Sequence, residues 1–233
     1  MPLQQEMEDL SPWHQIIEID GIKTPGRWDA RQQADFLKAN APWPLGPTIL
    51  DAGGNAGGIS IYLQGNGRQL TVVESSARYE KQFQLAAEHG CAPNVSFVRQ
   101  SLFDVHEMGA FDCVMMLGLF YHFRYPHMFL DYCAALDCTR FVFSTQTTKS
   151  DQLVLWNRSQ IKAYESRGFL GWQPSMKQFL MMLKASGFRI DADFSVDNKD
   201  FTNDYYVFCS KPERLEIDIP SIQKLSRSPS FWL

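Results

Sequence analysis

No stretch of this sequence stays apolar for long enough to cross a membrane, and basic residues are not in excess. Its 22 Lys and Arg residues stand against 26 Asp and Glu residues, so the formal net charge is −4 and gives no overall attraction for nucleic acid. A local basic patch can still exist within an acidic total, so nucleic acid is disfavoured as a partner but not excluded. Repeats and low-complexity linkers are also missing. Residues 1–9 are acidic where a secretory signal would be basic, so we expect a cytoplasmic protein.

Cysteine is scarce, and its spacing does not match a zinc site. The chain has five cysteines, and Cys133 and Cys138 lie close together without a second pair elsewhere. Cys113 and Cys209 fall inside strand-like apolar runs. We therefore expect small core residues in a reducing compartment, and no bound metal.

Apolar runs alternate with helical patterns through the middle of the chain. Hydrophobic residues make up 45% of the 233, enough for a sizeable core in one α/β domain with additions. Apart from Asp112, the run 111–117 is apolar, as expected of a strand buried on both faces. This alternation predicts a parallel, doubly wound sheet. The predicted strands are residues 48–52, 70–73, 95–99, 111–117 and 140–144, and the predicted helices are residues 58–64, 77–89 and 127–136.

Additions precede and follow a core that we place at residues 47–212. Residues 1–46 are expected to form an N-terminal arm or lid, with a hairpin within residues 16–26 and a helix at residues 29–39. The free place for such an arm in a small α/β domain is over the ligand edge of the sheet. Residues 213–233 form a C-terminal tail whose apolar end can dock on the body or on a second subunit of a homodimer.

After the last parallel strand the pattern changes. Residues 145–173 are polar and are expected to be irregular, whereas residues 175–185 carry apolar side chains at helical spacing. Two strands, residues 189–196 and 205–210, are predicted to close the sheet as a hairpin.

A glycine-rich loop between the first core strand and its helix is the most distinctive stretch. Asp51 ends the strand, and the glycines Gly53, Gly54, Gly57 and Gly58 follow. Glycines let the backbone take positive φ and let a ligand lie against it, and the first amides of the next helix are free donors. The loop therefore predicts a ligand site, with a glycine-rich turn that binds nothing as the alternative.

Three ligand patterns can be compared with this loop. The dinucleotide pattern Gly-x-Gly-x-x-Gly fails because Asn55 stands where the second glycine is needed, which makes an NAD enzyme a distant alternative. A Walker phosphate loop fails because Ile59, and not a lysine, follows the last glycine. Asp51, Gly53 and Gly57 match the third pattern, Asp-x-Gly-x-x-x-Gly, and here the chain resembles class I S-adenosyl-L-methionine (SAM) methyltransferases.

That resemblance implies cofactor contacts at the carboxyl ends of the strands, where open α/β sheets bind ligands. The loop amides would meet the amino-acid part of SAM, and Asp51 would orient the loop or the ammonium group. Glu74 would accept both ribose hydroxyls, although an ordinary exposed Glu has the same appearance in a sequence. Ser101 and Leu102 would flank the adenine. The full predicted set is Asp51, Gly53, Asn55, Gly57, Glu74, Ser75, Ser101, Leu102 and Leu117.

The strand end at residues 117–126 combines aromatic, imidazole and guanidinium groups. His122 can accept a proton from an attacking hydroxyl because imidazole titrates near neutral pH, although a hydrogen bond to neighbouring backbone is the structural alternative. The predicted catalytic residues are His122, His14 and Tyr121, and the predicted acceptor-side residues are Trp13, Lys23, Arg124, Arg158 and Trp172.

Three separated segments, Trp13–Gly26, Leu117–Pro126 and Trp172–Phe188, share a further likeness. They are similar to the Trp-x-His…Gly-x-x-Thr-Pro-Gly, Gly-Val-x-Tyr-His-Leu-x-x-Pro and Trp-x-Pro…Met-Leu…Gly-Phe segments of the tRNA wobble-uridine (mo5U34/cmo5U34) methyltransferase-like family. The resemblance implies a Rossmann-like class I methyltransferase fold. It would have a seven-stranded, mostly parallel sheet with an antiparallel last strand, plus the N-terminal arm.

These residues lead us to expect a SAM-dependent methyltransferase that acts on a small-molecule acceptor. Oxygen is the preferred acceptor atom, on a hydroxylated or aromatic metabolite. The acidic balance and the short arm favour a small acceptor over tRNA. Two alternatives remain open, a tRNA wobble-uridine (carboxy)methyltransferase and a SAM-binding module without catalytic activity.

Overall fold

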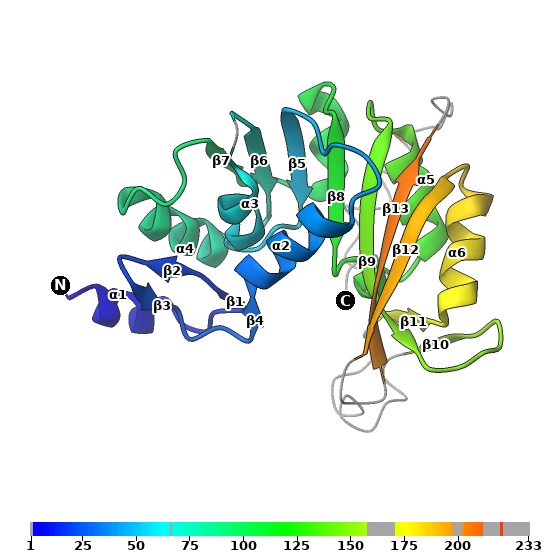
Figure 1. The fold of residues 1–233 in the computed structure, drawn as a ribbon, viewed down its shortest axis with the longest axis horizontal. Helices are drawn as coiled ribbons and strands as arrows, with labels where there is room; N and C mark the ends of the chain where they lie inside the picture. Colours follow the sequence, from blue (N-terminus) through cyan, green and yellow to red (C-terminus); the bar gives the residue numbers. More distant parts are fainter. Residues whose placement is uncertain (1, 66, 158–170, 198–201, 212–219, 221–233) are drawn as a thin grey trace. The chain divides into compact units, whose positions relative to one another are not determined.

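The computed structural model describes residues 2–65, 67–157, 171–197, 202–211 and 220. Its main sheet has seven strands in the order β12-β13-β9-β8-β5-β6-β7 (Figure 1). The chain divides into two compact units, Met1–Leu102 with Phe111–Val114, and Phe103–Ala110 with Met115–Leu233. The strands of the main sheet are β5 Thr48–Ala52, β6 Gln69–Val73, β7 Val95–Val98, β8 Cys113–Leu117, β9 Arg140–Thr148, β12 Arg189–Asp197 and β13 Thr202–Ser210.

The first unit contains a parallel three-stranded part of this sheet. β5 pairs with β6, and β6 pairs with β7, both in parallel, so that Ala52, Val73 and Val98 stand in register near the strand ends. Helix α3 (Gly58–Leu63) follows β5, and helix α4 (Ala77–Glu88) follows β6. The predicted alternation of strand and helix is confirmed here, and it brings three carboxyl strand ends to one edge.

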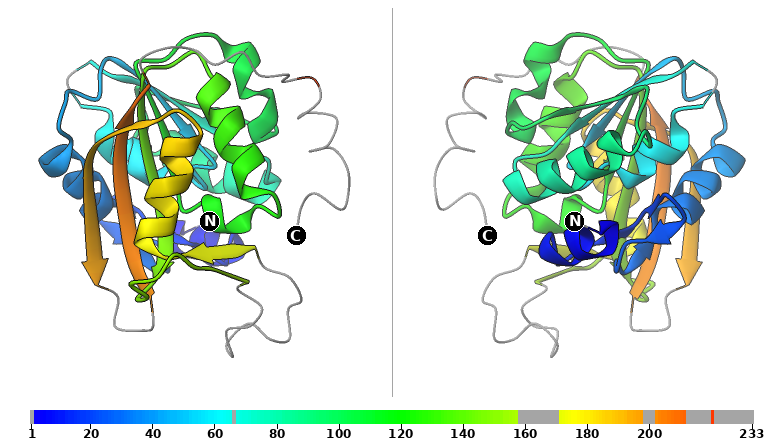
Figure 2. Two further views of the ribbon diagram at one scale, coloured as in Figure 1. Left: turned by 90° about the vertical axis from the view of Figure 1, so that its right-hand side faces the viewer. Right: turned by 90° about the vertical axis from the view of Figure 1, so that its left-hand side faces the viewer.

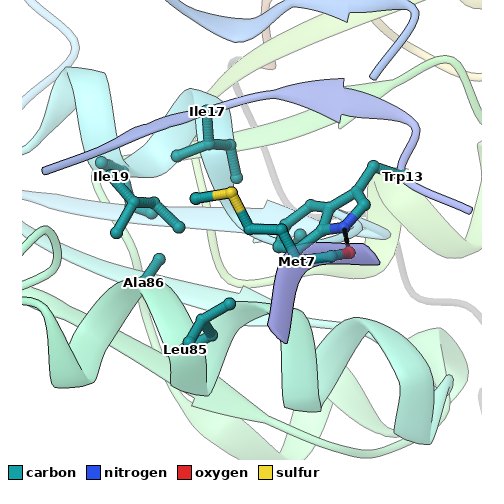
Figure 3. Packing of buried hydrophobic residues seen from close by; sticks show 8 residues of the cluster. Met7, Trp13, Ile17, Ile19, Leu85 and Ala86 are labelled. Carbon is teal, nitrogen blue, oxygen red and sulfur yellow. Dashed lines mark hydrogen bonds between the residues drawn. The ribbon is translucent and has the colours of Figure 1, made fainter. Parts of the chain in front are cut away.

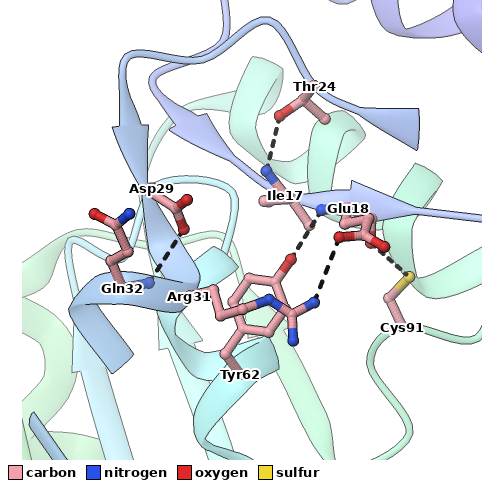
Figure 4. Close-up of polar contacts among 8 residues, drawn as sticks. All are labelled: Ile17, Glu18, Thr24, Asp29, Arg31, Gln32, Tyr62 and Cys91. Carbon is pink, nitrogen blue, oxygen red and sulfur yellow. Dashed lines mark hydrogen bonds and ion pairs between the residues drawn. The ribbon is translucent and has the colours of Figure 1, made fainter. Parts of the chain in front are cut away.

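The N-terminal arm of the first unit is made of short elements. They are α1 (Leu3–Asp9), β1 (Gln15–Ile16), β2 (Glu18–Ile19), β3 (Ile22–Lys23), β4 (Trp28–Asp29) and α2 (Ala30–Asn40). The predicted hairpin is confirmed as β2–β3, whose turn residues Asp20 and Gly21 both have positive φ, 47° and 80°. Asp29 caps the predicted helix α2 by accepting a hydrogen bond from the Gln32 amide (Figure 4). Helix α1 was not predicted.

The arm shares an apolar core with α3 and α4. Met7, Trp13, Ile17 and Ile19 of the arm are buried against a cluster completed by Ala56, Ile61, Leu85 and Ala86 (Figure 3). The Trp13 indole N–H donates a 2.7 Å hydrogen bond to the Met7 carbonyl. The arm is therefore packed on the glycine loop, on α3 and on the C-terminal half of α4, and it is not a loose extension.

The second unit closes the sheet with antiparallel strands. β13 pairs antiparallel with both β9 and β12, which confirms the predicted antiparallel last strand. Helices α5 (Pro126–Ala135) and α6 (Met176–Ala185) lie on the same side of these strands (Figure 2). Ser175 caps α6 by accepting from the Gln178 amide, and Gly187 follows the helix with a φ of 84°. The chain also forms two short 3-10 segments, Leu102–Met108 and Phe120–His122.

The prediction that residues 145–173 are irregular is wrong for most of the part that the structure describes. β9 continues to Thr148, and β10 (Leu155–Asn157) pairs antiparallel with β11 (Trp172–Pro174). Thr145, Thr147 and Thr148 are buried although they are polar, because threonine packs well in strands and β13 satisfies their backbone. Polarity in this stretch therefore did not indicate exposure.

Several expectations concern residues outside the described ranges. The predicted docking of the tail falls on residues 213–219 and 221–233, and the predicted contact of Arg158 falls within residues 158–170. In the described part of the chain, no helix combines the length and apolar character needed to cross a membrane. Four of the five cysteines are buried and Cys91 is partly buried, all as free thiols, as expected of core residues.

Candidate functional site

The glycine loop joins β5 to α3 through three residues with left-handed backbone. Gly53, Asn55 and Gly57 have φ of 70°, 54° and 74°. The Gly53 amide donates to the Val73 carbonyl at 2.7 Å, which ties the loop to the end of the neighbouring strand. Positive φ costs little for glycine and is tolerated by asparagine, so the residue types fit the conformation. The predicted strand–loop–helix unit is present.

Asp51 contacts the glycine loop through its buried carboxyl group. Its buried carboxyl accepts a 2.7 Å hydrogen bond from the Ser60 hydroxyl. A Cβ on Gly54 would lie 2.7 Å from Asp51 Cγ and Oδ2, so the loop backbone packs directly on the carboxyl group. Burial, with a smaller contribution from Glu74, raises the pKa of Asp51 to about 6. Asp51 thus contacts both the loop backbone and the first turn of α3, and its predicted role in orienting the loop or an ammonium group stays a prediction.

Asn55 carries a polar atom that the loop leaves unsatisfied. Its Oδ1 is buried and has no hydrogen-bond partner among the described residues. A buried acceptor of this kind costs about 1–3 kcal/mol unless a donor reaches it. The loop therefore has an acceptor that suits a hydrogen-bond donor on a ligand.

Glu74 follows β6 at the adjacent strand end. Its Oε1 accepts from the amides of Ser75 and Ser76 at 2.8 and 3.1 Å, and from the Ser75 hydroxyl at 3.4 Å. Ser76 is the N-cap residue of α4, so the carboxylate lies at the helix start, where the helix dipole favours negative charge. All three contacts fix one oxygen and so orient the whole carboxylate.

The third strand end continues the same edge. The Glu74 amide donates to the Val98 carbonyl at 3.2 Å, so residues 99–102 leave β7 beside Glu74. Ser101 is half-buried and Leu102 is 8% exposed. Within the first unit, the structure therefore brings together the predicted cofactor residues of three strand ends, and Leu117 ends β8.

His14 lies in an aromatic and cationic environment that the arm and α4 create. Its ring stacks on Trp28 at 5.8 Å and meets Tyr79 edge-on at 5.8 Å. Burial, followed by the charges of Arg78 and Arg27, lowers the pKa of His14 below its usual value of 6.5. The imidazole is therefore neutral near pH 7 and can accept a proton.

Two other predicted residues of the arm lie differently. Trp13 is 3% exposed and belongs to the apolar core, so its observed role is packing. Lys23 is exposed on β3. Their predicted contacts with an acceptor stay predictions.

In the second unit, Tyr121, His122, Arg124 and Trp172 come together. The ring centroids of Tyr121 and His122 are 4.5 Å apart. His122 is exposed, whereas Tyr121 is half-buried. The Trp172 indole N–H donates to the Arg124 carbonyl at 3.0 Å. A Cβ on Gly171 would lie 1.7 Å from the Tyr121 carbonyl oxygen, so the segment before β11 presses directly on this turn.

Two buried residues of interest were missed by sequence reasoning. The Gln15 side chain accepts from the Gly58 amide at 2.8 Å and is 7% exposed. Gln173, in β11, is 1% exposed and its Oε1 has no partner among the described residues. A polar residue at an inward position of an alternating apolar run could have indicated Gln15, whereas no sequence signal indicated Gln173.

Comparison with known proteins gives a consistent result. The model of a family described as "Methyltransferase domain" matches residues 26–192. The solved N-terminal domain of EvdMO1 with SAH bound is 19% identical, with a TM-score of 0.68, over 91% of this chain and 96% of that one. Magnesium protoporphyrin IX methyltransferase (ChlM) from Synechocystis PCC 6803, with bound SAH, is 21% identical, with a TM-score of 0.59, over 78% of this chain and 83% of that one. These two likenesses show the fold.

A curated relative is more similar in sequence over a shorter stretch. The tRNA U34 carboxymethyltransferase of Pseudoalteromonas translucida (strain TAC 125) is 28% identical over 126 residues, which are 53% of this chain. The match covers 39% of that relative, so the chain spans well under half of its length.

Proposed function

Because the chain belongs to the methyltransferase domain family, we propose that it transfers a methyl group from SAM to a small-molecule acceptor, at an oxygen of a hydroxylated or aromatic metabolite. The observation that carries this proposal is the meeting of the glycine loop, Glu74 and residues 99–102 at one edge of β5, β6 and β7. When bound, SAM supplies an electrophilic methyl group on a sulfonium, so the protein's main task is to align the acceptor with it.

The residues at this edge fit the cofactor. The unsatisfied Oδ1 of Asn55 and the loop amides suit an ammonium and a carboxylate, the two charged groups of an amino acid. Glu74, already held through Oε1, suits a pair of ribose hydroxyls. Ser101 and Leu102 offer a polar and an apolar contact for adenine. Asp51 keeps the loop in place, and Ser75 and Leu117 complete the proposed set.

The chain offers two histidines for the acceptor proton. His14 is held neutral by burial and by two arginines, so it can take the proton of a hydroxyl without first losing one. His122 is exposed beside Tyr121, where it can reach an acceptor that approaches from solvent. We favour His14 as the base because burial and the two arginines lower its pKa and so favour its neutral form. Tyr121, Arg124 and Trp172 are proposed to orient the acceptor.

A tRNA wobble uridine is the second candidate acceptor. The 28% identity with a tRNA U34 carboxymethyltransferase favours it. The net charge of −4 argues against it, because tRNA binding depends on neutralising phosphates with Lys and Arg. We therefore rank it below a small metabolite.

Calorimetry with SAM and with S-adenosylhomocysteine (SAH) tests the cofactor. We expect heat from both, and the absence of heat from both would remove the proposal. The protein is then incubated with SAM carrying a labelled methyl group and, separately, with a small-molecule cell extract or with bulk tRNA. Label in the small-molecule fraction supports the proposal, whereas label in tRNA alone, with binding that weakens steeply as salt rises, would replace it with the second candidate.

A further inference from the structure

We propose that Gln15 is a positioning residue through which the N-terminal arm holds the cofactor loop in its binding conformation. The inference rests on the proposed cofactor site and adds to it a residue outside the predicted set. One side-chain amide spans the loop, since Oε1 accepts from the Gly58 amide at 2.8 Å and Nε2 donates to the Gly54 carbonyl at 3.4 Å.

Gln15 occupies an inward position in an otherwise apolar row. Trp13, Ile17 and Ile19, two and four residues away, are buried in the core cluster, with Trp13 and Ile17 on either side of Gln15 along the chain (Figure 3). A polar side chain buried at such a position is unfavourable unless its hydrogen bonds are made. Both Oε1 and Nε2 of Gln15 form hydrogen bonds with the loop, which gives a physical reason for a glutamine at this position.

The Gly58 amide needs a partner that its own helix cannot give. It is a first-turn amide of α3, and the capping residue Gly57 has no side chain with which to accept a hydrogen bond. Gln15 supplies that acceptor from 43 positions away in the sequence. The arm therefore caps the helix that begins where the predicted cofactor loop ends.

The arm packs so closely on Gly58 that this position has no room for a side chain. A Cβ on Gly58 would lie 2.8 Å from Ala30 Cβ and 2.9 Å from both Gln15 Oε1 and Ile17 Cγ1. All three neighbours belong to the arm. Gly58 is thus needed for the approach of the arm, in addition to any need for the approach of a ligand.

The backbone of Gln15 is itself locked. Its carbonyl accepts from the Thr24 hydroxyl at 2.8 Å, and the same Thr24 oxygen accepts from the Ile17 amide at 2.9 Å (Figure 4). A Cβ on Gly26 would lie 2.3 Å from the Gln15 carbonyl, so the turn after Thr24 packs flat on this residue. The Thr-Pro-Gly stretch of the arm therefore fixes where the Gln15 amide lies.

A second glutamine ties the arm to the other cofactor-binding element. Gln82, on α4, donates through Nε2 to the carbonyls of Leu10 and Pro12 at 2.7 and 3.1 Å. α4 starts at Ala77, three residues after Glu74, the proposed ribose ligand. The arm is thus joined both to the loop and to the helix of the acid, and an ordered arm favours the binding geometry of both.

The experiment compares Gln15→Met, which keeps the size and removes both hydrogen bonds, with the control Gln32→Met on the exposed face of α2. SAH affinity is measured by calorimetry, and hydrogen exchange is followed in peptides covering residues 53–60. We expect about a tenfold weaker SAH affinity and faster exchange at residues 53–60 for Gln15→Met only. Gln15→Glu, which keeps the acceptor for the Gly58 amide, should lie between it and the wild type.

Wild-type exchange gives a second measurement if Gln15→Met does not fold. Because coupling between two parts of a binding site is reciprocal, SAH should slow exchange in arm residues 13–26 as well as in the loop. SAH binding by Gln15→Met within twofold of the wild type, or no slowing in residues 13–26, would overturn the inference. Wild-type protein that binds no SAH would instead count against the proposed cofactor site, so the two failures are distinct.

Discussion

Ser60 donates a 2.7 Å hydrogen bond from its hydroxyl to the buried carboxyl of Asp51, across the glycine loop. Ser60 lies in the first turn of α3 and Asp51 lies in β5, so the bond fastens the two ends of the loop to each other. The Gln15 amide bridges the same loop from the arm. The loop is thus held from the strand, the helix and the arm before any ligand is considered.

Asp51→Asn is expected to change how stability depends on pH. Burial raises the pKa of Asp51 from 3.8 to about 6, so between these values the folded protein keeps a proton that the unfolded chain releases. This contribution to stability is complete below pH 3.8 and is lost as pH rises through 6, a decline of about 3 kcal/mol at about 1.4 kcal/mol per pH unit.

Urea unfolding of the wild type and of Asp51→Asn at several values between pH 4 and pH 7 measures this effect. The difference in the free energy of unfolding should move in favour of the variant as pH rises. Asp151→Asn, at an exposed position, is the control and should follow the wild type. If the free energies of unfolding of the wild type and of Asp51→Asn differ by the same amount at every pH, the raised pKa of Asp51 is contradicted.

Glu74→Ala is expected to weaken SAH binding by well over tenfold, because two charge-assisted hydrogen bonds to the ribose would be lost. Glu74→Gln keeps an oxygen for the amides of Ser75 and Ser76 and removes the charge, so it should weaken binding less. Glu88→Ala, at the exposed far end of the same helix, is the matched control. Equal affinities for Glu74→Ala and Glu88→Ala in calorimetry would refute the ribose contact.

Gly171→Ala should destabilise the second unit by more than about 3 kcal/mol. Its Cβ would lie 1.7 Å from the Tyr121 carbonyl oxygen, and its φ of +87° is strained for any residue with a Cβ. Gly65→Ala has no atom within 4 Å of the new methyl group and should change stability by less than about 1 kcal/mol. Denaturant unfolding of the two variants decides the matter, and similar midpoints would show that residues 120–124 can shift to make room.

The parts of the site that could be predicted from sequence are those specified by neighbouring residues. The Asp51–Gly57 pattern identifies its own strand, turn and helix because glycine and asparagine are the residues that accept positive φ. Glu74 could be placed because it directly follows the predicted strand 70–73. The fold class followed from the alternation of strands and helices, and the cofactor from the resemblance of the Asp51–Gly57 pattern to class I methyltransferases; both are confirmed.

Contacts between distant residues could not be predicted in the same way. The bond between Gln15 and Gly58 depends on a hairpin and a turn that bring the arm over α3, and no pattern in either segment specifies it. Thr145–Thr148 was expected to be irregular because the segment is polar, and its pairing with Thr202–Tyr205 was not predicted. Likewise, the burial of Trp13 depends on Leu85 and Ala86 of α4, which lie far from it in the sequence.

Arg78→Gln is expected to move the acid limb of the pH–rate profile to higher pH if His14 is the base. Arg78 is the larger of the two charged contributors that lower the pKa of His14, so its removal should raise that pKa toward 6.5. A base acts in its neutral form, so activity falls below its pKa, and a higher pKa shifts that fall to higher pH.

Arg189→Gln, exposed on β12, is the control and should leave the acid limb in place. kcat/KM is measured across pH with the acceptor that the labelled-SAM screen identifies. His14→Gln should remove the acid limb. If Arg78→Gln leaves the limb in place and His122→Gln removes it, the base is His122.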